Sequence, residues 1–376
     1  MDSLIDCISN LAKQKGQTME KFINQTLIDS YSRNPNLGTN GRVVYPSIDE
    51  PVIIKDGETY VPGLNVMLSE NYEKAKQIKG GQDKIIKNQY KVPDGPIGWY
   101  MSEKFDGQRA IWDGKKFISR GSSSGNPKVY SYVPIWFVAL MPPGIPLDGE
   151  FFIARDSFTE TTSILKKKLK PENQRTKKDI SQQELDKLWV KIKYQVFDTI
   201  SNELFEERQT KLKKIVKERC AIWKELSIPG YIKKGLCPLI LTEQYLIKTP
   251  SDVNTFYNSL TNEKAEGVMI RAPGIPYIPR RTKFILKLKV EEDAECIIKG
   301  PHKPGEGKYS GMVGSFRCQL IENDKPVNKY TYLSGITDQV RQEGIPENTI
   351  ITYTYNGITP DGLPRHPRFK GFPSDR

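Results

Sequence analysis

The sequence predicts an α+β protein: a mixed region of strands and helices followed by a small β-barrel. Between residues 61 and 290, short alternating strands are interspersed with amphipathic helices. After residue 290 helices become rare, and segments such as "AECIIKG", "GSFRCQLIE", "KYTYL" and "TIITYTY" are separated by Gly, Pro and Asn turns, which is typical of a small barrel. Residues 1–60 read as a short, partly helical extension. We therefore expect domains at 61–290 and 291–376.

Local patterns predict individual elements within this frame. Residues 67–78, "MLSENYEKAKQI", are expected to be helical, and "GWYMSEKF" is expected to be a strand. The next segment predicts a hairpin that turns on Asp113-Gly114. A long amphipathic helix is expected over about 204–226, and Ser251 is expected to cap a further helix.

Charge and hydropathy narrow the class of protein. The 376 residues include 57 Lys and Arg against 45 Asp and Glu, a net charge of +12 that favours a polyanion such as nucleic acid. The longest apolar run, around residues 133–141, contains a proline and is far shorter than the roughly 20 residues of a membrane span. The first residues lack the pattern of a secretory signal. We expect an intracellular protein that does not bind membranes.

The cysteines and histidines exclude several kinds of site. The five cysteines show no CxxC spacing, so neither zinc nor a disulfide framework is expected, and a reducing compartment fits. With only two histidines, the chain has almost no material for a histidine-based triad or a His-rich metal site.

The stretch "SEKFDGQR", residues 102–109, offers a candidate nucleophile in Lys104. A free lysine has a pKa near 10.4, so only about one molecule in 2,500 is deprotonated at neutral pH. Attack on phosphorus therefore requires nearby cations or a metal to lower that pKa and hold a polyphosphate. Arg109 lies five residues further on, and Gly107 would let the turn approach a ligand closely. Taken alone, the stretch could also be an ordinary strand-to-turn junction.

Other segments could supply the remaining parts of such a site. Glu150 in "PLDGEFF" and Glu266 in "AEGVMIR" each lie at an apolar strand, and Mg²⁺ needs only one or two protein carboxylates. In "ILKLKV" the alternation puts Lys287 and Lys289 on one face, where they could clamp a triphosphate. Phe197 could stack on a base or belong to the core. The basic run "KKKLKPENQRTKK", residues 166–178, could be a solvated loop or a phosphate-binding loop.

Taken in order, these segments resemble the motif series of ATP-dependent DNA ligases, in the covalent nucleotidyltransferase superfamily. The series comprises Lys104-Phe-Asp106-Gly107-Gln-Arg109, Ser119-Arg120-Gly121, Asp148-Gly149-Glu150, Val196-Phe197-Asp198, Glu266-Gly267-Val268 and Leu286-Lys287-Leu288-Lys289. The segments "GEGKYSGMVGSFRC" (305–318) and "GLPRHPRFKGFPSDR" (362–376) resemble the start of the family's OB domain and its terminal motif. The stretch around Lys104 is most like the short ligases of bacteria and large DNA viruses.

The resemblance implies a nucleotidyltransferase (adenylation) domain of antiparallel sheets with flanking helices, followed by a C-terminal OB-fold β-barrel. Lys104 would become adenylylated by ATP and pass AMP to a nick in duplex DNA. Mg²⁺, with Mn²⁺ able to substitute, would be held by Glu150 and Glu266, and Phe197 would stack on adenine. The implied nucleotide-binding residues are Ser102, Asp106, Arg109, Arg120, Glu150, Phe197, Lys287, Lys289, Arg365 and Arg368. The implied DNA-binding residues are Arg120, Lys166, Lys167 and Lys168. The enzyme would act as a monomer in the cytoplasm or nucleus, or in a virus-infected host cell, in replication or repair.

Three alternatives stay open at this point. An RNA ligase and an mRNA capping guanylyltransferase share the lysine chemistry, and a catalytically idle protein could use an OB-fold to bind nucleic acid. The end of the chain also departs from the family pattern. The terminal motif of the family often ends with a further Arg followed by an acid, whereas residues 372–376 read "FPSDR". Which terminal arginine contacts pyrophosphate is therefore open.

Overall fold

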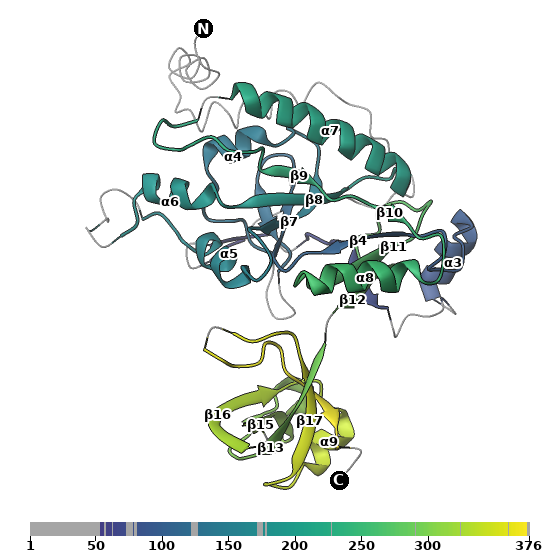
Figure 1. Ribbon diagram of the computed structural model, residues 1–376, viewed down its shortest axis with the longest axis vertical. Coiled ribbons are helices and arrows are strands. Elements are labelled where there is room, and N and C mark those ends of the chain that lie inside the picture. Colours follow the sequence, from purple (N-terminus) through teal and green to yellow (C-terminus); the bar gives the residue numbers. More distant parts are fainter. Residues whose placement is uncertain are drawn as a thin grey trace. The chain divides into compact units, whose positions relative to one another are not determined.

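The computed structural model describes residues 53–373, apart from 56–57, 62, 73–77, 79–80, 122–126, 171–175, 177–178, 227, 290, 324 and 360. Contacts divide the chain into two units between Leu288 and Lys289. Figure 1 labels many of the elements of both units. The helices expected within residues 4–11 and 22–28 lie outside the described residues.

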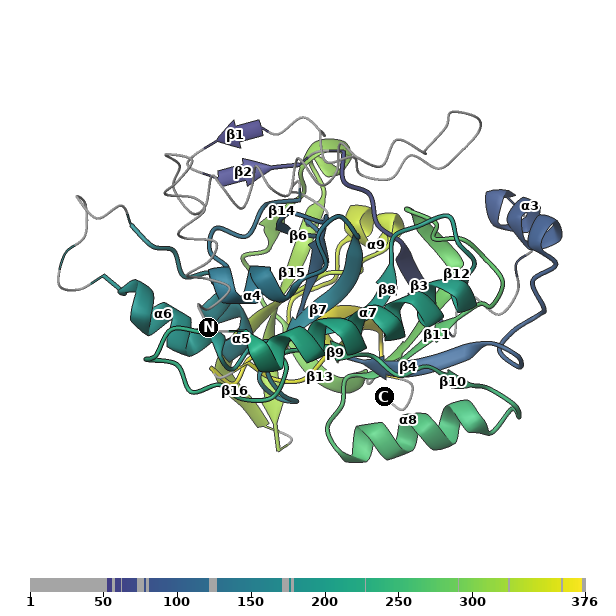
Figure 2. The same cartoon turned by 90° about the horizontal axis from the view of Figure 1, so that it is seen from above.

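Two five-stranded sheets form the framework of the first unit (Figure 2). The first sheet, which we call the nucleophile sheet, has the order β10 (Tyr245–Leu246), β4 (Tyr100–Lys104), β11 (Gly267–Arg271), β12 (Arg281–Lys289) and β3 (Leu68–Asn71). The second, which we call the carboxylate sheet, has the order β6 (Phe117–Ser119), β5 (Gln108–Trp112), β7 (Leu147–Phe152), β8 (Lys193–Thr199) and β9 (Leu239–Leu241). A short hairpin of β1 (Ile53–Lys55) and β2 (Glu58–Tyr60) precedes them.

Six helices among the described residues flank these sheets. They are α3 (Gly81–Tyr90), α4 (Ile135–Leu140), α5 (Phe158–Leu165), α6 (Gln182–Trp189), α7 (Phe205–Glu225) and α8 (Asp252–Asn262). The expected long helix is confirmed as α7, which packs along β8 and β9 (Figure 1). Its buried residues recur at helical spacing, as an amphipathic helix requires. The helix after Ser251 is confirmed as α8, although the Ser251 side chain makes no capping hydrogen bond.

Each sheet has its own hydrophobic core. One cluster gathers Trp99, Met101, Val268, Ile270 and Phe284 around the nucleophile sheet, and another packs aromatic side chains between the carboxylate sheet and helices α4 to α7. In the second cluster Trp112, Phe137, Phe151 and Trp189 are at most 1% exposed. Burying a large apolar side chain contributes about 1.5–3 kcal/mol, so these clusters hold the two sheets as rigid supports.

The helix expected over residues 67–78 is wrong at its beginning. Residues Leu68–Asn71 form strand β3, which pairs in parallel with β12 through Leu68↔Arg281 and Glu70↔Leu286. All four β3 residues are half-buried. Pairing with a distant strand therefore outweighs the local helical pattern, as tertiary context commonly does.

The C-terminal unit is the expected small barrel. Its sheet has the order β14 (Lys303–Pro304), β15 (Val313–Glu322), β13 (Glu292–Ile298), β17 (Ile350–Tyr355) and β18 (Arg368–Gly371), and β16 (Lys325–Leu333) pairs with β15. The short helix α9 (Asp338–Glu343) lies between β16 and β17 in sequence. Inward-facing residues such as Phe316, Leu333 and Ile351 form its core. The alternating segments seen in the sequence therefore correspond to real strands.

The cysteines depart from expectation, because two disulfides are present. Cys220 pairs with Cys237 in the first unit, and Cys296 pairs with Cys318 between β13 and β15. Their Cα atoms are 5.6 and 5.7 Å apart, and the partners are separated by 17 and 22 residues. The expectation considered only short CxxC spacings, whereas the fold brings these distant positions together. The pairs also remove one argument for a reducing compartment.

Within the described ranges, no helix combines the length and apolar character needed to cross a membrane.

Candidate active site around Lys104

Lys104 is the last residue of β4 and lies beside the start of β11. The register pairs Lys104 with Gly267, so the residue just before β11, Glu266, reaches the lysine. The Lys104 Nζ and a Glu266 carboxylate oxygen form an ion pair, and both side chains are about one-fifth exposed (21% and 20%). The lysine is thus neither a freely solvated surface residue nor part of the core.

Gly107 brings Glu150 of the carboxylate sheet close to this lysine. Residues 105–107 carry the chain from β4 in the nucleophile sheet to β5 in the carboxylate sheet. There the Gly107 N–H donates to Glu150 Oε1 at 3.0 Å. A Cβ at Gly107 would lie 2.2 Å from the Phe151 carbonyl oxygen, so only glycine fits this crossing. The crossing therefore places Glu150, Glu266 and Lys104 in one neighbourhood.

Electrostatics couples these three groups. Burial raises the pKa of Glu150 to about 7, with Lys104 opposing the shift and Glu266 adding to it. A carboxyl group in such surroundings is stabilised in its charged form by any added cation. Two carboxylates beside one lysine therefore form a site that favours a metal ion or a cationic partner.

Arg109 is held by a hydrogen-bond network with Asp148, Met67 and Tyr277. Its Nε donates to Asp148 Oδ1 at 2.9 Å and its NH2 group donates to the Met67 carbonyl oxygen at 2.8 Å. The hydroxyl of Tyr277 donates to Asp148 Oδ2 at 2.7 Å and accepts from the Met67 N–H at 3.0 Å. Asp148 and Tyr277 are fully buried. The network fixes the guanidinium of Arg109, which is itself mostly buried.

Phe197 lies on β8, and two guanidinium groups lie near its ring. The Cζ atoms of Arg271 and Arg109 are 4.9 and 5.6 Å from its ring centroid. The neighbouring residue Asp198 is fully buried and pairs with Arg208 at 2.7 Å and with Arg271 at 3.4 Å. Phe197 is only half-buried, so part of its ring is accessible to a planar ligand. Phe197 is therefore a partly accessible ring rather than a fully buried core residue.

The structure distributes the other expected site residues as follows. Ser102 is buried on β4, Asp106 lies in the crossing, Arg120 is exposed directly after β6, and Lys287 and Lys289 are half-buried on β12. Arg365 and Arg368 belong to the C-terminal unit. Lys166 and Lys168 are exposed just after α5, and Lys168 pairs with Glu58 of β2.

The carboxylates fit a magnesium ion of the kind that the sequence predicts. Mg²⁺ commonly takes one or two protein carboxylates and completes its shell with water and phosphate oxygens. Glu150 and Glu266 provide two such groups beside Lys104. Among the described residues, no group of three or more His, Cys, Asp or Glu side chains could hold a metal by themselves. A magnesium ion held by these two carboxylates would complete its shell with water and phosphate oxygens.

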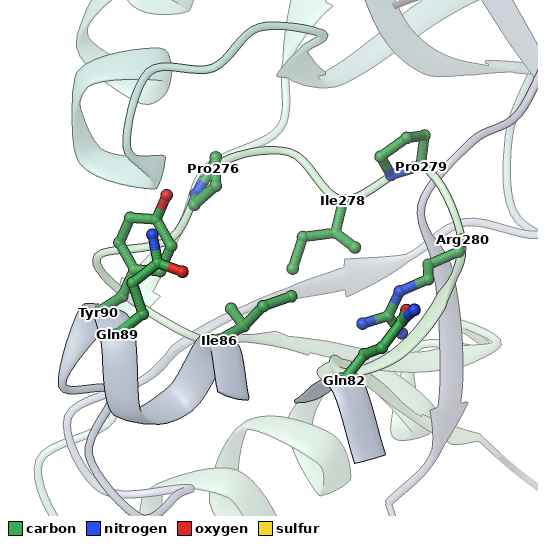
Figure 3. Close-up of a pocket in the computed structure, with 8 residues that line it drawn as sticks. All are labelled: Gln82, Ile86, Gln89, Tyr90, Pro276, Ile278, Pro279 and Arg280. Atoms are coloured by element: carbon green, nitrogen blue, oxygen red, sulfur yellow. The ribbon is translucent and has the colours of Figure 1, made fainter. Parts of the chain in front are cut away.

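A separate cavity of about 390 Å³ lies between α3 and the loop before β12 (Figure 3). Ile86 and Ile278 face each other across it, with Gln82, Tyr90 and Arg280 at its edge. None of the expected site residues lines it. The cavity is therefore distinct from the site around Lys104.

Three functional candidates escaped the sequence analysis: Arg155, Arg271 and Tyr277. Arg271 follows four residues of an apolar strand and is 5% exposed, so it needs a buried acid, which Asp198 provides. The sequence did contain a signal for Arg271, because a charged residue at the end of an otherwise apolar strand indicates a buried ion pair. Arg155 and Tyr277 lie in loops, where no periodicity marks them.

Comparisons with known proteins agree with this geometry. A family model described as an ATP-dependent DNA ligase domain matches residues 74–289, more than half of the chain. A second, described as a DNA ligase OB-like domain, matches residues 304–372. The chain belongs to the ATP-dependent DNA ligase family. The prediction that the chain is an ATP-dependent DNA ligase is confirmed. The two parts of the fold are a nucleotidyltransferase domain and an OB-fold domain.

Individual members of the family support this membership. The DNA ligase of Haemophilus influenzae is 31% identical over 270 residues, which cover 71% of this chain and 84% of that protein. The DNA ligase of Methanothrix thermoacetophila is 32% identical over 110 residues, 28% of this chain and 20% of that protein. A solved structure of a Lig E DNA ligase matches 82% of this chain and 98% of its own, with 24% identity and a TM-score of 0.59. The last likeness shows the shared fold.

Proposed function

We propose that the chain seals nicks in duplex DNA through a lysyl-AMP intermediate on Lys104. The observation that carries this proposal is the position of Lys104 beside Glu266 and Glu150, where the two sheets meet. The deprotonated Nζ would attack the α-phosphorus of ATP, forming an N–P bond as the bond to pyrophosphate breaks. An oxygen of the DNA 5′-phosphate would then displace the lysine from AMP. Finally the 3′-hydroxyl would attack the 5′-phosphorus and release AMP.

Protein groups would assist each of these steps. Phe197 would stack on adenine, Ser102 and Asp106 would contact the nucleotide, and Arg109 would hold the ribose and phosphates. Lys287 and Lys289 would neutralise the α-phosphate. Glu150 and Glu266 would hold Mg²⁺, which when bound supplies positive charge that offsets the charge developing on the phosphates. Arg120 would serve both the nucleotide and the nick 5′-phosphate, and Arg365 and Arg368 of the OB-fold unit would orient pyrophosphate.

Intact mass of the purified protein after incubation with Mg²⁺ and ATP, and in a parallel sample with Mg²⁺ and GTP, tests the proposal. We expect one added AMP, and we expect it to disappear when nicked duplex DNA is supplied. Lys104→Ala should lose both labelling and sealing while still binding the nick, and Lys213→Ala, an exposed lysine of α7, is the matched control. A GMP adduct would instead favour the capping branch. Absence of any adduct on a folded, initially unmodified protein would leave only nucleic-acid binding.

Lys166, Lys167 and Lys168 are proposed to contact DNA phosphates. Lys168 already pairs with Glu58, so binding would exchange this exposed carboxylate contact for a phosphate. Neutralising all three should weaken nick binding and flatten its dependence on salt. An unchanged salt slope would return this segment to a solvated loop.

The proposal also covers the oligomeric state, the location and the role of each domain. We propose that the enzyme works as a monomer on DNA inside a cell, with residues 61–290 supplying adenylation and residues 291–376 the OB-fold. Light scattering of the adenylylated protein with and without a nick tests the oligomeric state, and a stable dimer would contradict it.

A further inference from the structure

One arginine outside the proposed catalytic set bridges two other segments. Arg155 follows β7, and its Nε and NH2 groups donate to the two carboxylate oxygens of Glu103, each at 3.0 Å. Its NH1 group donates to the carboxylate of Glu263 at 2.5 Å and to the Glu263 carbonyl oxygen at 3.3 Å. The guanidinium thus uses all three of its nitrogens.

The bridged segments are those that carry the proposed chemistry. Glu103 immediately precedes Lys104 on β4, and Glu263 lies three residues before Glu266. Arg155 itself lies five residues after Glu150. A single side chain therefore connects the segments of the nucleophile and of both carboxylates.

Arg155 contacts the residue next to Lys104 on β4. Glu103 and Lys104 are neighbours on β4, so their side chains leave the strand on opposite faces. The Arg155 guanidinium and the Glu103 carboxylate are joined by two parallel hydrogen bonds. This pairing fixes both the distance between the two groups and their relative orientation, whereas a single point charge would fix only the distance. The end of β4 is thereby tied to the carboxylate sheet from the face opposite Lys104.

Stability alone does not account for this arrangement. The Glu263 side chain is 70% exposed, and such exposed ion pairs contribute little to folding. The Glu103 contact is more enclosed, with side chains 28% and 20% exposed, and it has the two-pronged geometry that carries positional information. A second pair beside it, Lys264 and Asp156 at 3.2 Å, is also largely exposed. The enclosed Glu103 contact is the one that matters for the site.

We propose that Arg155 is a positioning residue that sets Lys104 in register with Glu150 and Glu266 for self-adenylylation. This inference rests on the proposed function, because it assumes that Lys104 is the nucleophile. It predicts an effect on the rate of the first chemical step at saturating ATP. It predicts little effect on the affinity for ATP or for the nick, because the hydrogen bonds of Arg155 go to Glu103 and Glu263, which are outside the proposed nucleotide- and DNA-binding residues.

The test is single-turnover self-adenylylation of Arg155→Met at saturating Mg²⁺ and ATP. We expect at least a tenfold fall in rate, with the apparent KM for ATP and the affinity for nicked DNA within twofold of wild type. Arg219→Met is the control, since Arg219 of α7 also fastens two elements, through the Ala139 and Leu140 carbonyl oxygens, away from Lys104. Arg219→Met should have a lower melting temperature than wild type. Its rate of self-adenylylation should equal the wild-type rate when the two proteins are assayed well below their melting temperatures.

Glu103→Gln provides a second route that does not depend on the folding of the Arg155 variant. It weakens the same contact, so its rate should also fall, and Glu103→Gln/Arg155→Met should be no slower than the slower single variant. A wild-type rate for Arg155→Met, multiplicative effects in the double variant, or a loss confined to nick affinity would each overturn the inference. An unlabelled wild-type chain would overturn the proposed function with it, whereas equal labelling rates would overturn only the role of Arg155.

Discussion

The hydroxyl of Tyr277 donates a hydrogen bond to the buried carboxylate of Asp148 at 2.7 Å, and Asp148 in turn holds Arg109. Burial and the charge of Asp148 raise the pKa of Tyr277 well above its ordinary value, so the hydroxyl remains a donor. Tyr277→Phe removes only this oxygen and leaves the Met67 N–H without its acceptor. We expect a loss of about 1–3 kcal/mol in unfolding free energy and a several-fold higher apparent KM for ATP.

Tyr194→Phe is the matched control for that prediction. Tyr194 is equally buried, and its hydroxyl donates to the Ala110 and Leu147 carbonyl oxygens rather than to the Asp148 carboxylate that holds Arg109. It should cost similar stability and leave the apparent KM unchanged. Equal changes in KM for both variants would contradict a specific link between Tyr277 and Arg109.

The raised pKa of Glu150 predicts a pH-dependent stability in the metal-free and ATP-free protein. The folded value is about 7 and the ordinary value is 4.5, so between these pH values the folded chain binds more protons than the unfolded chain. Stability should therefore fall as pH rises through this window. Relative to Glu150→Gln, wild type should lose about 1–3 kcal/mol between pH 5 and pH 8. Denaturant titrations at both pH values measure it, with Glu160→Gln, at an exposed position of α5, as the control. Parallel curves for wild type and Glu150→Gln would refute it.

Gly107 offers a steric test of the crossing between the sheets. In Gly107→Ala the new methyl group would meet the Phe151 carbonyl oxygen at 2.2 Å, and backbone cannot yield cheaply. We expect a destabilisation of about 1–3 kcal/mol and a fall of at least a hundredfold in self-adenylylation. Gly230→Ala should be neutral, because nothing lies within 4 Å of its added methyl. Normal labelling of Gly107→Ala would show that Glu150 does not need this close approach.

The two disulfides predict a defined thiol count and a measurable stabilisation. Alkylation after reduction should add four more labels than alkylation of the unreduced, unfolded protein, because four cysteines are paired. Replacing Cys296 and Cys318 together with alanine should cost about 2–4 kcal/mol, by the usual loop-closure effect. Calorimetry under non-reducing conditions checks this. Identical labelling with and without reductant would mean that the pairs do not form.

Sequence patterns captured the parts of the fold that depend on local periodicity. The helix α7 and the barrel strands β13, β15 and β17 follow from apolar spacing and turn residues alone. By contrast, β3 depends on pairing with β12, and the disulfides depend on which strands become neighbours. Neither kind of information is present in a short window of sequence.

Some residues of the candidate site could be predicted from local sequence, and others could not. Lys104, Glu150 and Glu266 could be singled out because each lies next to an apolar strand in a recognisable motif. Tyr277 and Arg155 could not, because each gains its meaning from an acid more than 50 residues away, Asp148 or Glu103. Residues so far apart in the sequence can be recognised as partners only once the folded arrangement of the two sheets is known.

The pairing of Asp198 with Arg208 couples an outer helix to the inside of the molecule. Arg208 belongs to α7, and Asp198 is the neighbour of Phe197. A fluorophore attached at Lys213, an exposed residue of the same helix, would therefore lie on an element that is ion-paired to the neighbour of Phe197. Such a reporter would test whether nucleotide loading is felt at α7 without occupying the site itself.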